Sequence, residues 1–220
     1  MGRHAGLLRP RFSQTHPPTG GHPLTALLQF SRWIDALTER IGRWTSWLVL
    51  AAVVISAANA IVRKAFNTSS NAYLEIQWYL FAGIFLLAAG YTLLRQEHVK
   101  IDVVLGHFSR RTQVWVEILG TLVFLMPIAL VVIDLSLPVV WKAYTSGEVS
   151  SNAGGLIRWP VYALLPVGFA LLALQGVSEV IKRLAFLQGL ADDPAKKLST
   201  KTAEEELAEV IRAQAEGAAK

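Results

Sequence analysis

The chain has 220 residues, of which 53% are hydrophobic and 17% charged, and its formal net charge is +5. This apolar share exceeds what the core of a soluble domain of this length requires, so the composition favours a membrane protein. The basic residues lie beside long apolar runs, which argues against nucleic acid binding, and the absence of cysteine excludes disulfides, thiolate catalysis and cysteine-ligated metal sites.

The first segments of the chain are predicted to lie outside the hydrocarbon. Residues 1–24 contain three arginines and paired Pro and Gly residues without an apolar signal core, and we expect a disordered arm that is retained. Residues 25–43 form an expected amphipathic helix, because apolar residues recur there at steps of three and four: Leu27, Phe30, Ile34, Leu37, Ile41 and then Trp44.

Four later segments are apolar and long enough to cross a bilayer as helices, which requires about 20 residues. They are residues 44–62, 76–94, 114–137 and 159–181. Glu117, Asp134 and Glu179 are expected near span ends, where a charged group reaches the headgroups. The predicted fold class is therefore an all-α polytopic membrane protein, with a four-helix membrane domain over residues 44–186.

Orientation follows from the Lys and Arg residues outside the spans, which number six, two, four, two and seven in chain order. The positive-inside rule then predicts that both termini are cytoplasmic. Residues 100–111 are expected to form an interfacial helix, and residues 187–220 a cytoplasmic tail with a short helix at 203–215. The tail is either a solubilising segment or a partner contact.

The stretch from Arg95 to Asp102 carries five ionisable groups directly after an uncharged span, and we interpret it first as a membrane boundary. His98 and Asp102 have a spacing that permits metal binding, but two ligands without further His or Cys make a weak site; a hydrogen bond between them is the alternative. Histidines are absent from all four spans, which excludes a b-type cytochrome. No hydrolase elbow or phosphate loop is present, so we expect neither an enzyme nor a cofactor.

Small residues in the spans permit close helix contacts, within this chain or with another membrane subunit; they include Ala52, Ser56, Ala60, Gly83 and Gly90. No ionisable residue is expected at the bilayer middle, which argues against an independent carrier. The alternatives kept open are an independent four-helix channel or carrier and a membrane anchor for an enzyme or electron transfer.

Three ordered stretches resemble the small membrane subunit of tripartite ATP-independent periplasmic (TRAP) transporters, the DctQ-like family. They are Val62-Arg63-Lys64-Ala65-Phe66-Asn67 leading to Glu75, then His98-Val99-Lys100-Ile101-Asp102, and finally Gly147 to Ser151 followed by Trp159 and Leu165-Pro166-Val167-Gly168-Phe169. The segment from Gly154 to Pro160 is similar to the branch named for mannitol or chloroaromatic compounds, although an organic acid is the expected substrate.

The resemblance implies a non-catalytic scaffold in the bacterial inner membrane. Its implied partners are a large membrane subunit, which carries the sodium and substrate ligands, and a periplasmic substrate-binding protein. It also implies structural or subunit-interface roles for eight residues: Arg63, Glu75, His98, Asp102, Arg158, Trp159, Pro166 and Gly168.

Overall fold

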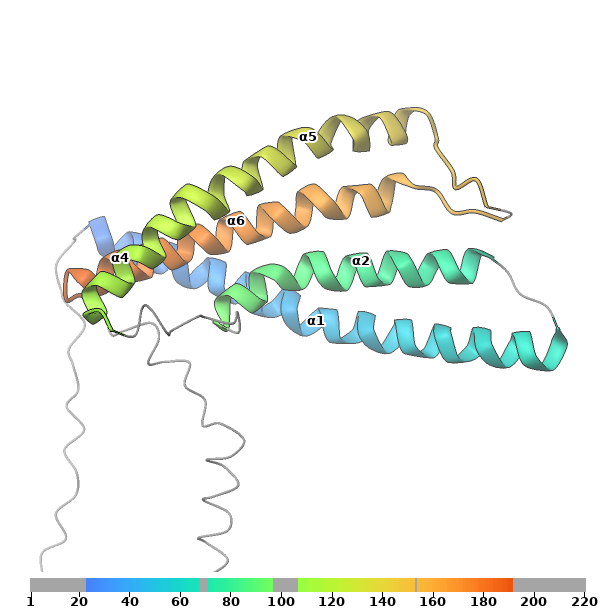
Figure 1. The fold of residues 1–220 in the computed structure, drawn as a ribbon, viewed down its shortest axis with the longest axis horizontal. Coiled ribbons are helices and arrows are strands. Elements are labelled where there is room, and N and C mark those ends of the chain that lie inside the picture. The colour runs from blue at the N-terminus through green and yellow to red at the C-terminus, as the bar shows by residue number, and fades with distance from the viewer. Residues whose placement is uncertain (1–22, 68–70, 97–106, 153, 192–220) are drawn as a thin grey trace, which may run out of the picture.

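The computed structural model describes residues 23–67, 71–96, 107–152 and 154–191. Within these ranges the chain is helical and contains no strand beyond one isolated bridge between Val149 and Ile157. The helices are α1 (Pro23–Phe66), α2 (Asn71–Leu94), α4 (Arg110–Gly120), the π-helical turn η1 (Thr121–Leu125), α5 (Met126–Thr145) and α6 (Trp159–Leu187) (Figure 1). Four helices are long and apolar enough to cross a membrane, if the consecutive segments α4, η1 and α5 are counted as one continuous helix.

Helix α6 is the centre of the arrangement. It packs against α1, α2, α4 and α5, whereas α5 packs chiefly against α6. In its most apolar 18-residue window 33% of the residues are buried, against 11% in each of the other three. The α1–α2 pair and the α5–α6 pair separate toward the loops that follow α1 and α5, and come together at the opposite end (Figure 1).

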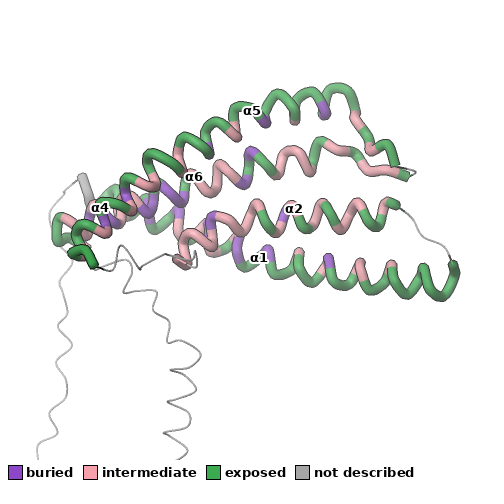
Figure 2. The backbone as a smooth tube through the Cα atoms, viewed as in Figure 1, coloured by how far each residue is buried: buried purple, intermediate pink, exposed green. Residues whose placement is uncertain are grey.

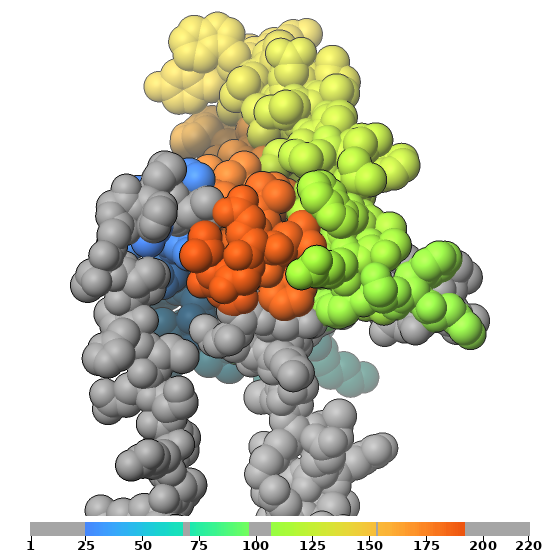
Figure 3. Space-filling view, turned by 90° about the vertical axis from the view of Figure 1, so that its left-hand side faces the viewer, coloured from blue at the N-terminus to red at the C-terminus, as the bar shows by residue number. Residues whose placement is uncertain are grey.

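Burial follows this shape. The fully buried residues concentrate where the helices converge, while most residues elsewhere are partly or fully exposed (Figure 2). Seen from that end, the C-terminal part of α6 lies between α1 and α4 (Figure 3). Since exposed apolar side chains cover all the spans, the surface is suited to lipid or to another membrane protein rather than to water.

Small residues bring the helices close together. A Cβ atom on Gly168 of α6 would lie 2.7 Å from the backbone oxygen of Leu86 in α2, and one on Gly42 would lie 2.3 Å from the ring of Tyr91. Pro166 of α6 is also buried. These positions hold helices at a distance that larger residues would not allow.

Two helix boundaries differ from the sequence expectation. The amphipathic stretch 25–43 and the span 44–62 form one uninterrupted helix, because no Gly or Pro pair breaks α1 and both parts pack on neighbours. The third span, expected to end at 137, continues through Pro138 to Thr145. Pro138 removes a single hydrogen-bond donor, and an apolar helix in lipid tolerates this better than an unpaired loop.

The expected segments outside the spans are only partly described. Residues 1–22 and 192–220 lie outside the described ranges, so the N-terminal arm and the tail helix 203–215 stay predictions. Most of the expected interfacial helix 100–111 also lies outside them. Of its described residues, 107–109 are not helical, and 110–111 are the start of α4, which has Ser109 as its N-cap. The Ser109 hydroxyl accepts a hydrogen bond from the Thr112 amide, which explains this start.

Gly168→Ala should lower stability by about 1–3 kcal/mol, because the new methyl group would overlap the Leu86 backbone. Gly120→Ala is the matched control, since a Cβ there has no neighbour within 4 Å. Thermal unfolding of both variants in detergent tests this. Equal unfolding temperatures would contradict the close approach of α2 and α6.

Candidate functional site

Glu75 in the first turns of α2 holds the loop between α5 and α6. Its carboxylate accepts hydrogen bonds from the Ser150 hydroxyl, from Asn152 Nδ2 at 2.7 Å and from the Leu156 amide at 2.8 Å. The loop also closes on itself, because the Ser150 amide donates to the Leu156 carbonyl at 2.9 Å. Glu75 is therefore the centre of a loop clamp that joins α2 to residues 150–156.

Arg158 closes the same loop from its other end. Its guanidinium lies 3.1 Å from the Glu148 carboxylate and 3.3 Å from the Tyr162 hydroxyl. These hydrogen bonds raise the pKa of Arg158, the one with Tyr162 having the larger effect, and keep the guanidinium charged. Trp159 packs edge-on against Tyr144 with ring centroids 5.6 Å apart. This contact places the C-terminal end of α5 beside the start of α6.

Beside the clamp lies an open groove of about 580 Å³, lined mainly by aromatic and polar residues of α2 and α6; they include Glu75, Trp78, Tyr79, Arg158 and Tyr162. The Tyr79 hydroxyl donates to the Ile157 carbonyl at 3.2 Å, so the groove floor is also tied to the loop. The two charged groups at the groove, Glu75 and Arg158, are already engaged by residues of the loop and by Tyr162. We find no nucleophile and base arrangement in it.

The remaining predicted residues divide into three groups. Arg63 is exposed on α1 and lines a second groove, of about 610 Å³, with Lys64 and Asn67; it is not joined to Glu75. Pro166 and Gly168 serve helix packing. His98 and Asp102 lie outside the described residues, and among the described residues no group of three or more His, Cys, Asp or Glu could hold a metal.

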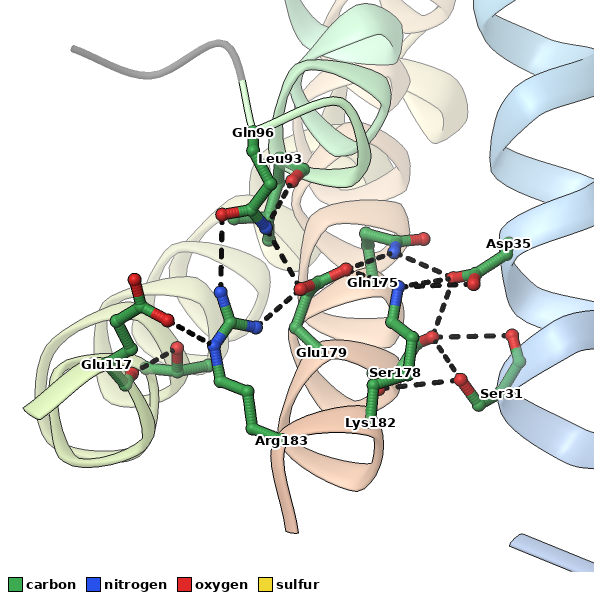
Figure 4. Close-up of polar contacts among 11 residues, drawn as sticks. Ser31, Asp35, Leu93, Gln96, Glu117, Gln175, Ser178, Glu179, Lys182 and Arg183 are labelled. Carbon is green, nitrogen blue, oxygen red and sulfur yellow. Dashed lines mark hydrogen bonds and ion pairs between the residues drawn. The ribbon is translucent and has the colours of Figure 1, made fainter. Parts of the chain in front are cut away.

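A second polar group, at the end where the helices converge, was not anticipated as a unit. We call it the inner polar cluster (Figure 4), and its members come from α1, the end of α2, α4 and α6: Ser31, Asp35, Gln96, Glu117, Gln175, Ser178, Glu179, Lys182 and Arg183. It joins α1, α4, α6 and the residues that follow α2, whereas none of its members lies in α5.

Arg183 is the branching point of the cluster. Its Nε lies 2.8 Å from the Glu117 carboxylate, one terminal nitrogen contacts Glu179, and the other donates to Gln96 Oε1 at 3.3 Å. Gln96 in turn donates to Glu179 at 3.0 Å. One guanidinium thus connects α6 to α4 and to the end of α2, using the fork of donors that only Arg provides.

Asp35 performs the corresponding role for α1. Its carboxylate lies 3.1 Å from Lys182 Nζ, and it accepts from the Ser178 hydroxyl at 2.7 Å and from Gln175 Nε2 at 2.9 Å. The Ser31 and Ser178 hydroxyls are 2.7 Å apart. Lys182 also pairs with Glu179, so both halves of the cluster meet at that carboxylate.

The cluster is largely removed from solvent. Glu179 is 2% exposed and Arg183 5%, so their charges are stabilised by each other rather than by water or headgroups. This corrects the expectation that Glu117 and Glu179 are separate charges at helix ends. A buried pair of this kind specifies one arrangement of helices, because separating the partners leaves an uncompensated charge.

The sequence carried a signal for this cluster. Its α6 members recur at steps of three and one on one face of an otherwise apolar helix, and Ser31 and Asp35 are four residues apart on α1. Two matching polar stripes on different helices predict a contact. Neither stripe alone identifies its partner.

Asp134 also departs from its expected position. Because α5 continues to Thr145, this residue stands eleven positions before the helix end, about 16 Å along the axis. Along the helix axis it lies about 10 Å before Trp141. Asp134 is exposed on the outside of the bundle, so it does not line an interior path.

The fold and the two polar sites define a polytopic helical membrane protein whose charged groups tie its helices together. A sequence model of the family described as "Tripartite ATP-independent periplasmic transporters, DctQ component" matches residues 52–186, more than half of the chain. The chain therefore belongs to the DctQ family, the small subunit of TRAP transporters. No curated protein and no solved structure matches it significantly.

Family membership gives the general setting. DctQ proteins are transporter components rather than a catalytic family, and they work in tripartite systems with a large membrane subunit and a substrate-binding protein. The four apolar helices are consistent with a multi-pass membrane location.

Glu75→Ala should loosen the loop clamp, because the Leu156 amide and the Ser150 and Asn152 side chains lose their common acceptor. Hydrogen exchange at residues 148–157 should become faster by about tenfold or more, a loss of roughly 1–3 kcal/mol of local protection. Arg63→Ala is the control and should leave this exchange unchanged. An unchanged rate in the Glu75 variant would contradict the clamp.

Arg183→Leu should destabilise the bundle by about 3–5 kcal/mol, because Glu117 and Glu179 would each lose their ion pair with the buried Arg183. The control is Arg95→Leu, which breaks the half-exposed 3.0 Å pair with Glu39 and should cost about 0–1 kcal/mol. Denaturant unfolding of both variants in mixed micelles measures the difference. Similar losses would show that the cluster is no more stabilising than a surface ion pair.

Proposed function

We propose that this chain is a small, non-catalytic subunit that braces the large membrane subunit of a sodium-coupled TRAP transporter for an organic acid. In this proposal it lies in the bacterial inner membrane with both termini in the cytoplasm, as the distribution of Lys and Arg predicts. A periplasmic substrate-binding protein delivers the solute. The similarity to the branch named for mannitol or chloroaromatic compounds does not determine the substrate class in this proposal.

The observation that carries the proposal is the internal pairing of the charges in the packed part of the bundle. Glu117, Glu179, Lys182, Arg183 and Asp35 are joined to each other. A carrier needs a charged group that is free to bind and release an ion during its cycle. A cluster that instead locks four helices into one arrangement is suited to support a moving partner.

The alternative of an independent channel or carrier has less support. The grooves described above open on the surface of the bundle, beside the loop clamp and between the outer ends of α1 and α2. The exposed carboxyl of Asp134 is on the outside of α5. These positions favour contacts with other molecules over a conduit through this chain.

Within the proposal, the candidate residues have different tasks. Glu75, Arg158 and Trp159 fix the loop between α5 and α6, Gly168 sets the spacing of α2 and α6, and Pro166 is a buried packing residue of α6. Arg63 is exposed and is the described candidate for a contact at the outer end of α1. His98 and Asp102 remain candidates for the boundary that follows α2.

Affinity purification of the tagged chain from its native membranes should recover a much larger polytopic subunit. Proteoliposomes with both membrane subunits and the binding protein should take up solute when a sodium gradient is applied, whereas this chain alone should show no uptake above empty vesicles. Sodium-driven uptake by the chain alone would refute the bracing role.

A further inference from the structure

Asp134 is in an unfavourable place for a lipid-facing carboxyl. The outer boundary of the hydrocarbon is marked on α5 by Trp141 and by Tyr144, which contacts Trp159 at the start of α6. Asp134 lies about 10 Å along the helix axis from Trp141 and about 15 Å from Tyr144, which is roughly a third to a half of the thickness of a hydrocarbon core. Its carboxyl is therefore well inside the bilayer rather than at its edge.

The carboxyl also lacks a partner in this chain. Asp134 is exposed, and it makes no hydrogen bond or ion pair with any described residue. This distinguishes it from Asp35, Glu117 and Glu179, which are all paired. Whether ionised or protonated, a carboxyl facing hydrocarbon without a hydrogen-bond partner is costly.

The backbone adds a second acceptor at the same position. In an α-helix the carbonyl of residue 134 accepts from the amide of residue 138, and Pro138 has no amide hydrogen to donate. Asp134 thus presents a carboxyl and a carbonyl without its regular helical donor on one side of α5. In lipid both acceptors favour a donor from another protein.

The surroundings of Asp134 provide an extended apolar surface. Its helical neighbours are exposed as well, including Leu130, Val131, Leu135 and Trp141. α5 packs chiefly against α6, so the side of α5 turned away from α6 is not covered by the described part of the chain. Membrane helices often pair through an apolar face that carries a single polar residue within the bilayer. This face of α5, with the Asp134 carboxyl, has that composition.

We propose that this face of α5 is the docking surface for a membrane helix of the large subunit, and that the helix presents a hydrogen-bond donor, Arg, Lys or an amide, to Asp134. The inference rests on the proposed function, which supplies the membrane partner, and adds which helix meets it and through which chemistry. A donor at this depth would stabilise both acceptors, and the apolar neighbours would then pack around the contact.

The position of the interface can be tested by photo-crosslinking in membranes that contain both subunits. A benzophenone amino acid at Val131 should crosslink to the large subunit. The same probe at Val54, a valine of α1 that is equally exposed at 56%, is the control and should not. Crosslinking from Val54 only, equal crosslinking from both, or crosslinked dimers of this chain from Val131 would overturn the proposal.

The chemistry of the contact can be tested by Asp134→Leu and Asp134→Asn. The leucine variant should bind the large subunit about three- to thirty-fold more weakly, the range expected for an interhelical hydrogen bond in membranes. The asparagine variant keeps an acceptor and should fall between it and wild type. The unfolding temperature of the isolated chain should stay equal or rise with Asp134→Leu, which separates weaker assembly from misfolding.

The outcomes also separate this inference from the function it rests on. If the wild-type chain recovers no large subunit, the proposed function and the docking surface both fail. If wild type recovers it but Asp134→Leu assembles with unchanged affinity, only the role of Asp134 in docking is overturned.

Discussion

The arrangement of this protein depends on one constraint: polar groups that enter a bilayer must find their partners within protein, because lipid offers none. Backbone groups meet it by forming helices. The ionisable side chains of the converging ends meet it through the inner polar cluster, where Arg183 and Lys182 neutralise carboxylates from three helices. Helix order and helix pairing follow from these contacts more than from apolar packing, which lipid competes with equally well.

The two ends of the bundle solve the constraint differently. At the converging end, charges are buried and connect helices to one another. At the outer end, α2 and α6 are connected through a loop, which Glu75 and Arg158 hold in place. The first end is rigid because several helices would have to separate together. The second end leaves one groove between α2 and α6 and another between α1 and α2, and these offer surface to other molecules.

The four spans could be predicted from the sequence because a run of about 20 apolar residues has few other uses. The continuity of α1 could not, since a change from amphipathic to apolar pattern at Trp44 does not reveal whether the helix bends. The extension of α5 was missed because Pro138 resembles a helix end, although it removes only one donor. That error placed Asp134 within about a turn of the helix end, whereas it stands eleven positions before it.

Residues of the candidate site show a similar division. Motifs point to Glu75 and Arg158, but their joint action on one loop depends on the contact between Glu75 and Leu156, which are 81 residues apart. Glu179 was visible as a charge in an apolar helix. Its donor Gln96 follows α2, and Glu117, which shares Arg183 with it, lies in α4; a single sequence does not indicate which helices are neighbours.

The unbroken α1 has a mechanical consequence. Its 44 residues measure about 66 Å, so roughly half of the helix extends past a hydrocarbon core of about 30 Å. A stiff rod anchored by Asp35 to α6 converts a small change of tilt in the membrane into a larger sideways displacement at its far tip. A rotation of about 10° would move the tip of a 30 Å overhang by about 5 Å. A change in the tilt of α1 is thereby enlarged at the end that extends past the hydrocarbon.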